Sequence, residues 1–357
     1  MREKPKNEFT TEGAGSAEHG GHREELDVRD EALANPVALR AGTGCGTFLT
    51  EALSALTLVI AFIFMFGLVI GSFLNVCILR IPEDLSIVTP GSHCPRCQTP
   101  IQWYDNVPVL GWLWLRAKCR TCGLPISPMY PLVELATGLL FVACYLEFGL
   151  TQATVKWLFF TCLLIVLTIT DLRVRLLPDL VNWPGFAAGL LFSAAVPPDD
   201  DPASYLFAIM LHRVAPRPLQ GLLAGLLGAA FGSFLLWAVA TIYKRVRGRE
   251  GMGMGDVKMM AMIGAFLGVR GAFLTILLGT LLGTLVGVTI IVLLFVAGWH
   301  RKLAERASRR GLGGVNALRW AIASQYQLPL GTFLGIAALL VVYFGPTMML
   351  RWSQLFV

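Results

Sequence analysis

Four of the eight cysteines stand as two close pairs. The pairs are Cys94-Pro-Arg-Cys97 and Cys119-Arg-Thr-Cys122, separated by residues 98–118. Two such CxxC knuckles can present four thiolates in a tetrahedron, which is the geometry of structural zinc sites. Four protein thiolates leave no position for water, so we expect a zinc ion with a folding role. Two redox dithiols, or four reduced thiols, are the alternatives.

Two aspartates stand at the ends of apolar runs. Asp171 closes one run, and Asp256 follows the glycine-rich segment 251–255 and opens another. Each has an ordinary explanation when taken alone. Asp171 can reach the membrane interface beside Arg173 and Arg175, and Asp256 can cap the start of a helix. Taken together, the two carboxylates lie at similar depth in their membrane helices and can share one proton.

A pair of carboxylates sharing a proton can hydrolyse a peptide bond. One ionised carboxylate takes a proton from water while the protonated partner polarises the scissile carbonyl. The negative end of a helix dipole disfavours a charged carboxylate, so helix polarity predicts that the proton rests on Asp171 and that Asp256 is the base. The glycines before Asp256 would let a substrate backbone approach closely because they lack a Cβ.

The composition places these residues in a membrane. Hydrophobic residues make up 55% of the chain and charged residues 15%, with a mean hydropathy of +0.65. This is too apolar for an ordinary soluble domain, so we expect a lipid bilayer around the chain. The formal charge of +6 indicates basic cytoplasmic loops, and we expect no nucleic-acid partner.

Changes in composition divide the chain into four parts. Residues 1–52 are rich in Glu, Gly, Asp and Arg, which predicts a disordered acidic tail. Residues 53–79 form an apolar run long enough to be the first transmembrane helix. Residues 80–129 form a small extramembrane module that contains the cysteine pairs. Residues 130–357 form the membrane-embedded domain that contains both aspartates.

The predicted fold is an all-α polytopic membrane protein with about eight transmembrane helices. The stretch at 257–269 is short and directly precedes the next at Arg270, so a count of seven is the alternative. After the first helix, the apolar stretches lie at 130–148, 155–171, 180–196, 219–243, 257–269, 271–297 and 328–350.

Basic residues set the predicted orientation. They gather in residues 80–129, 173–175, 244–249 and 301–319, and alternation of the helices puts all four segments on one side. An acidic run at 199–201 falls on the other side. The positive-inside rule therefore places the cysteine module and both aspartates at the cytoplasmic face of the membrane. Aspartates in membrane helices also occur in ion paths, so a transporter or channel is an alternative.

Several motifs in a fixed order resemble the bacterial type IV prepilin peptidase family over residues 68–345. By this resemblance, Asp171 and Asp256 match the two catalytic aspartates, and the four cysteines match a cytoplasmic zinc-binding loop. The final motif departs from the family at Gly331-Thr332, where Gly-Pro is more usual. The motifs are GSFLNVCILRIP (71–82), the cysteine module, YPLVE (130–134), the D…LPD pattern (171–179), GMGMGDVK (251–258) and LPLGTFLGIA (328–337).

The resemblance implies an intramembrane aspartic endopeptidase that removes the basic leader from prepilins or pseudopilins at the cytoplasmic membrane face. Many members also methylate the new N-terminus, so S-adenosylmethionine is a further expected cofactor. Glu134 is a candidate for the methyl-donor site, although the helix dipole is the preferred explanation of a carboxylate near a helix start. A non-catalytic assembly factor on the same scaffold is the remaining alternative.

Overall fold

The computed structural model describes residues 36–198, 216–248, 251–296 and 329–355. Within these ranges the regular structure is helical, apart from two isolated β-bridges. The all-α prediction is thus confirmed for the described residues. Residues Met1–Val59 and Ile60–Val357 form two compact units, which are described separately.

The first helix of the described residues, α2 (Pro36–Arg80), begins earlier than the predicted start at residue 53. Pro36 is its first residue, a position where the missing N–H of proline costs nothing. Once an apolar helix exists, adding residues to it is favourable because each brings one hydrogen bond. Residues 36–52 therefore extend the helix, while the rest of the predicted tail, 1–35, lies outside the described residues.

Five described helices are long and apolar enough to cross a bilayer. They establish a multi-pass membrane protein in outline, whereas the exact number of crossings stays a prediction. The shorter α6 (Asp179–Ala195) and the apolar part of α12 (Leu330–Leu355) accompany them. The five spans are Leu53–Glu83, which includes the second part of α2, α4 (Met129–Phe148), α5 (Gln152–Val174), α8 (Arg217–Arg247) and Met254–Ile290 within α9 (Met254–Val296).

Helix α9 is two helices that meet at Gly268. There the backbone has φ 72° and ψ −172°, a conformation that is essentially restricted to glycine. A Cβ on Gly335 of α12 would meet Met259 in the first half, and a Cβ on Gly279 in the second half would meet Leu334 of α12. In one straight helix, positions twenty residues apart would be separated by about 30 Å. The two halves therefore run back past each other, as the separate apolar stretches at 257–269 and 271–297 predict.

Glycines lie at several places where two helices approach each other closely. A Cβ on Gly228 of α8 would lie 2.4 Å from the carbonyl oxygen of Gly264 in α9. Likewise, a Cβ on Gly71 of α2 would lie 2.7 Å from the Cα of Glu134 in α4. Small residues at contacts of this kind let membrane helices pack backbone to backbone.

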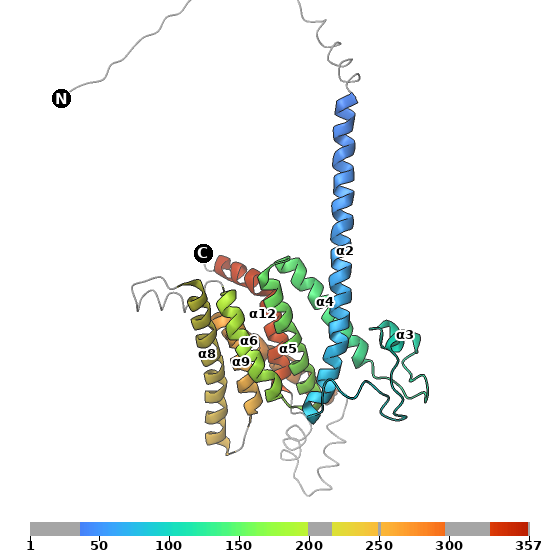
Figure 1. Cartoon of the computed structure of the whole chain (residues 1–357). Coiled ribbons are helices and arrows are strands. Elements are labelled where there is room, and N and C mark those ends of the chain that lie inside the picture. Colours follow the sequence, from blue (N-terminus) through green and yellow to red (C-terminus); the bar gives the residue numbers. More distant parts are fainter. Residues whose placement is uncertain (1–35, 199–215, 249–250, 297–328, 356–357) are drawn as a thin grey trace, which may run out of the picture. The chain divides into compact units, whose positions relative to one another are not determined.

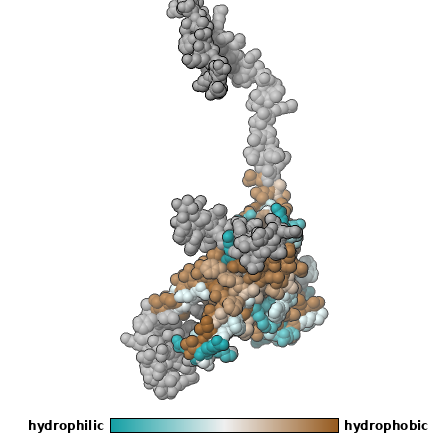
Figure 2. Space-filling model, turned by 90° about the vertical axis from the view of Figure 1, so that its left-hand side faces the viewer, coloured by the Kyte–Doolittle hydropathy of each residue, from teal (hydrophilic) through white to brown (hydrophobic). Residues whose placement is uncertain are grey.

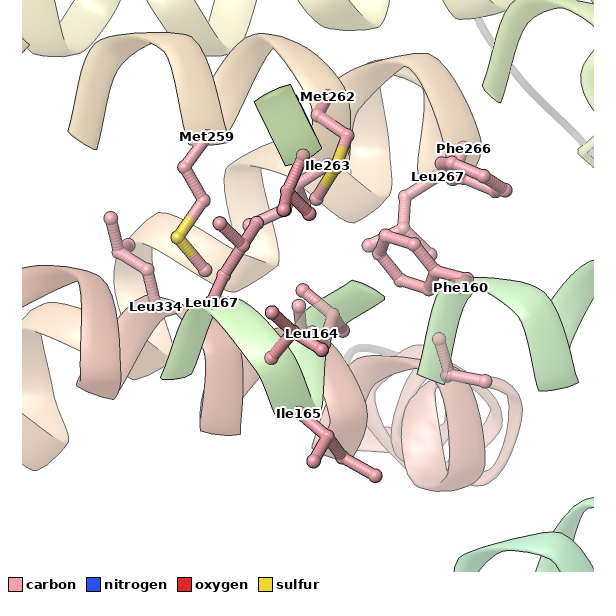
Figure 3. Packing of buried hydrophobic residues seen from close by; sticks show 14 of the residues in the cluster. Phe160, Leu164, Ile165, Leu167, Met259, Met262, Ile263, Phe266, Leu267 and Leu334 are labelled. Atoms are coloured by element: carbon pink, nitrogen blue, oxygen red, sulfur yellow. The ribbon is translucent and has the colours of Figure 1, made fainter. Parts of the chain in front are cut away.

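The apolar core joins α5 to α9 and α12, and α9 lies beside α6, α8 and α12 (Figure 1). The rings of Phe160 and Phe266 stack with centroids 4.5 Å apart, and the fully buried Leu164 and Met259 belong to the same apolar cluster (Figure 3). Large apolar side chains also cover the outside, as Figure 2 shows on one face. Such a surface suits lipid contact.

We expect Gly228→Ala to destabilise the bundle because its Cβ would collide with the backbone of α9. The loss should be about 1–3 kcal/mol, as for other overpacked cores, measured by thermal unfolding in detergent. Gly283→Ala is the matched control, since its Cβ would meet Phe333 at an ordinary 3.4 Å. Equal stability of the two variants would contradict the close contact.

Candidate active site

The four predicted metal ligands lie together in the extramembrane module. The Sγ atoms of Cys94, Cys97, Cys119 and Cys122 all lie within 4.8 Å of one another. Two of these Sγ–Sγ distances are 3.7 Å, between Cys94 and Cys122, and 4.0 Å, between Cys97 and Cys119. Four thiols at this spacing could hold a metal ion, as the CxxC pattern predicts.

Both cysteine knuckles have the same local fold. In the first, the N–H of Cys94 donates to Thr99 O; in the second, the N–H of Cys119 donates to Leu124 O. An isolated bridge closes each knuckle, His93 with Pro100 and Lys118 with Pro125. Gln98 and Gly123 take the same left-handed conformation directly after the second cysteine of each pair. This repeated turn is what directs the thiols of each pair toward a common centre.

Polar contacts around the cysteines support this arrangement. Hydrogen bonds from the side chain and backbone of Thr99 lower the pKa of Cys97 to about 6, which favours the thiolate that metals bind. Arg120, next to Cys119, pairs with Asp105 in the 3₁₀ helix η2 (Trp103–Asn106). The hydrogen bond from the Arg120 guanidinium holds the pKa of Asp105 below its usual value. The ion pair therefore fastens η2 to the second knuckle.

Glu134, the candidate for a methyl-donor site, has a partner in the module. Its Oε2 accepts the N–H of Val109 at 2.7 Å, directly before the short helix α3 (Leu110–Trp114). The neighbouring Asn75 Nδ2 donates to Tyr130 O at 3.0 Å. Glu134 is 8% exposed and so joins α4 to the module from a buried position. These contacts account for the carboxylate without a methyl donor.

The two aspartates meet at Gly331. Asp171 lies near the end of α5, Asp256 in the first turn of α9, and Gly331 at the start of α12. A Cβ on Gly331 would lie 2.9 Å from Asp171 Oδ2 and 3.0 Å from Asp256 Oδ1. Both carboxylates are buried, with exposures of 5% and 8%. The structure thus brings together two groups that are far apart in the sequence, and a Cβ at Gly331 would press on both carboxylates.

Thr332 is the closest partner of Asp171, a contact that the sequence pattern did not predict. Its backbone N–H donates to Asp171 Oδ2 at 2.7 Å, and its hydroxyl lies 3.1 Å from the same oxygen. The first N–H groups of a helix lack partners within the helix. Asp171 of α5 therefore caps α12. The one signal in the sequence was the departure from Gly-Pro at this position, because proline has no N–H to donate.

Asp179 lies outside the pair despite its place in the D…LPD motif. Its carboxylate binds Lys258 Nζ at 2.8 and 2.7 Å, and more than half of its side chain is exposed. This ion pair joins the start of α6 to the start of α9. Asp179 is thus a partner of Lys258 rather than a third member of the buried carboxylate site.

Comparison with known proteins connects this geometry to a family. The family model of the bacterial peptidase A24 N-terminal domain matches residues 65–148, and that of the type IV leader peptidase family matches residues 158–288. A prepilin leader peptidase/N-methyltransferase of Klebsiella pneumoniae is 38% identical over 226 residues, which cover 62% of this chain and 90% of the relative. The chain belongs to the type IV leader peptidase family.

Further relatives of this chain carry the same name. The protein of Aeromonas hydrophila is 34% identical over 278 residues, covering 66% of this chain and 88% of the relative. The protein of Myxococcus xanthus is 42% identical over 206 residues, covering 58% of this chain but only 55% of the relative. No solved structure matches the chain. The predicted family is thus confirmed, and its first matched segment contains the cysteines while the second contains both aspartates.

We expect Thr332→Val to destabilise the protein because a donor to the buried Asp171 is lost. The loss should be about 1–3 kcal/mol in thermal unfolding. Thr280→Val is the control, since that exposed hydroxyl binds only its own helix. In a double-mutant cycle with Asp171→Asn the two effects should not add. Additive effects would mean that the hydroxyl does not interact with Asp171.

Proposed function

We propose that the chain is an aspartic endopeptidase that removes the basic leader from type IV prepilins or pseudopilins. The observation that carries the proposal is the buried pair of Asp171 and Asp256 around Gly331. Two carboxylates this close cannot both ionise readily, so they are suited to share a proton. The names of the relatives supply the substrate class.

Hydrolysis by this pair would need one ionised and one protonated carboxylate. The ionised group removes a proton from water, and the water oxygen attacks the scissile carbonyl carbon, whose oxygen the protonated group stabilises. Collapse of the tetrahedral intermediate breaks the C–N bond, and the new amine takes up a proton from the pair. The two donors of Thr332 favour a charged Asp171. These hydrogen bonds favour the opposite of the assignment predicted from helix polarity. In the mechanism proposed here, Asp171 is the base and Asp256 is the acid.

We propose that the four cysteines hold a structural zinc ion. Four thiolates fill a tetrahedral coordination shell, so the ion would stabilise the module and leave the peptide chemistry to the aspartates. The two knuckles present the thiols close enough for one ion. A metal at this site would replace the apolar core that such a small module lacks.

The proposal also includes the location of the protein in the cell. The basic segments of the chain favour the inner membrane with the cysteine module and the aspartates at the cytoplasmic face. The eight apolar stretches would then all cross, with α9 contributing two crossings. The bilayer is the partner that covers the apolar outside of the bundle.

Methylation of the new N-terminus, with S-adenosylmethionine as donor, is a second proposed activity. It rests on the N-methyltransferase part of the relatives' names. The contact of Glu134 with Val109 gives that carboxylate a structural partner. We therefore assign no residue to the methyl donor and derive no step from it.

We expect Asp171→Asn and Asp256→Asn each to reduce cleavage at least about a thousandfold, because asparagine cannot exchange the proton. The assay is release of the leader from a purified prepilin, followed by mass spectrometry. Glu147→Gln, an exposed carboxylate at the far end of α4, should cleave normally. An inactive wild-type protein would favour the assembly-factor alternative, and an active Asp→Asn variant would contradict the pair.

We expect about one zinc ion per purified chain, lost when Cys94 and Cys119 are replaced by serine. Elemental mass spectrometry measures the ratio. Cleavage should persist in the presence of a chelator if the module stays folded, because the proposed chemistry belongs to the aspartates. Protein purified without any bound metal would refute the zinc site.

A further inference from the structure

The short helix α3 of the cysteine module exposes an apolar face. Leu110, Leu113 and Trp114 are 60%, 57% and 82% exposed. Positions i, i+3 and i+4 lie on one side of a helix, so these three side chains form a single surface, called here the α3 face. Large apolar groups gathered on one side of a small module indicate a surface that binds something.

The other side of α3 packs into the module. Gly111 is buried, and Trp112 Nε1 donates to Ile126 O at 3.1 Å. A Cβ on Gly111 would collide with the carbonyl oxygen of Asp105 in η2, so the two short helices touch through their backbones. These contacts fix the orientation of α3 and leave the α3 face pointing away from the module.

The contact between Glu134 and Val109 places α3 at the level of the membrane interface. Helix α4 has 20 residues and is about 30 Å long, which is the thickness of the hydrocarbon core that it would cross. Its first residue therefore lies near the boundary between headgroups and acyl chains, and Glu134 lies about 7 Å further in. Val109 N is 2.7 Å from Glu134 Oε2, and α3 begins at the next residue. Helix α3 thus begins at the boundary rather than in bulk water.

Basic side chains flank the α3 face. Arg116 and Lys118 follow α3 directly, and both are exposed. Between residues 85 and 128 the sequence contains one carboxylate, that of Asp105, and Arg120 is paired with it. Tryptophan is enriched at membrane interfaces, and basic residues there attract anionic lipids. A second copy of this face, or the basic leader of a prepilin, would instead bring like charges together.

We propose that the α3 face inserts into the bilayer interface at the start of α4, with Arg116 and Lys118 on the headgroups of anionic phospholipids. The three apolar side chains of the α3 face would reach the upper part of the acyl chains. The cysteine module would then be held against the membrane at two places, the contact with Glu134 and the α3 face. The inference goes beyond the proposed function and does not depend on peptide cleavage.

Fluorescence quenching by brominated lipids tests the insertion. The full-length protein, carrying the fluorescent amino acid L-Anap in place of Trp114, is reconstituted into vesicles of phosphatidylcholine with about 30% phosphatidylglycerol. Lipids brominated near the top of the acyl chain should lower the emission about twofold. The same probe at Leu139, exposed within α4, should also be quenched, and at Arg96, exposed on the first cysteine knuckle, it should not. Emission at Trp114 that ignores bromine would overturn the proposal, and a shift on adding prepilin or on raising the protein density would then identify the substrate or a second copy as the partner.

Variation of the lipid charge tests the two basic residues. With the probe at Trp114, raising phosphatidylglycerol from none to about 30% should increase the quenching about twofold. The double variant Arg116→Gln/Lys118→Gln should lose this increase, because it lacks the charges that bind the headgroups. The matched control Arg245→Gln/Arg247→Gln, which removes two exposed charges at the end of α8, should keep it. An increase that persists without Arg116 and Lys118, or that is absent from the protein with both, would overturn the headgroup contact.

Discussion

Burial of two carboxylates around Gly331 is the constraint on which the rest of the structure depends. A charged group inside an apolar bundle is unfavourable unless hydrogen bonds or a shared proton compensate for the lost water. Thr332 supplies hydrogen bonds to Asp171 at the unpaired start of α12. Asp256 lies on the other side of the same glycine. The ends of three helices are thereby tied to one point.

The packing of the helices holds their ends together around Gly331. Gly268 reverses α9, so that both of its halves pack against α12 near Gly331. Gly228 and Gly264 bring α8 and α9 into backbone contact, and the ion pair of Asp179 with Lys258 joins α6 to α9. Rigid contacts of this kind hold catalytic groups more precisely than loops do.

Sequence patterns predicted features formed by residues close together in the sequence and missed contacts between residues far apart in it. The CxxC spacing predicted the thiol cluster because each pair is formed within one turn, and apolar runs predicted the helices because length and hydropathy decide them. The contact of Thr332 with Asp171 joins positions 161 residues apart, which no spacing reveals. The early start of α2 at Pro36 was missed because helix extension needs no apolar signal. The catalytic roles of Asp171 and Asp256 stay predictions.

The central claim is that the two aspartates act as one unit, and non-additivity tests it most directly. Single-turnover cleavage of a prepilin is measured with excess enzyme for Asp171→Asn, Asp256→Asn and the double variant. If the pair shares one proton, removing either member destroys the whole function, and the double variant should be no slower than either single variant. Losses that multiply in the double variant would show two independent groups and contradict the account.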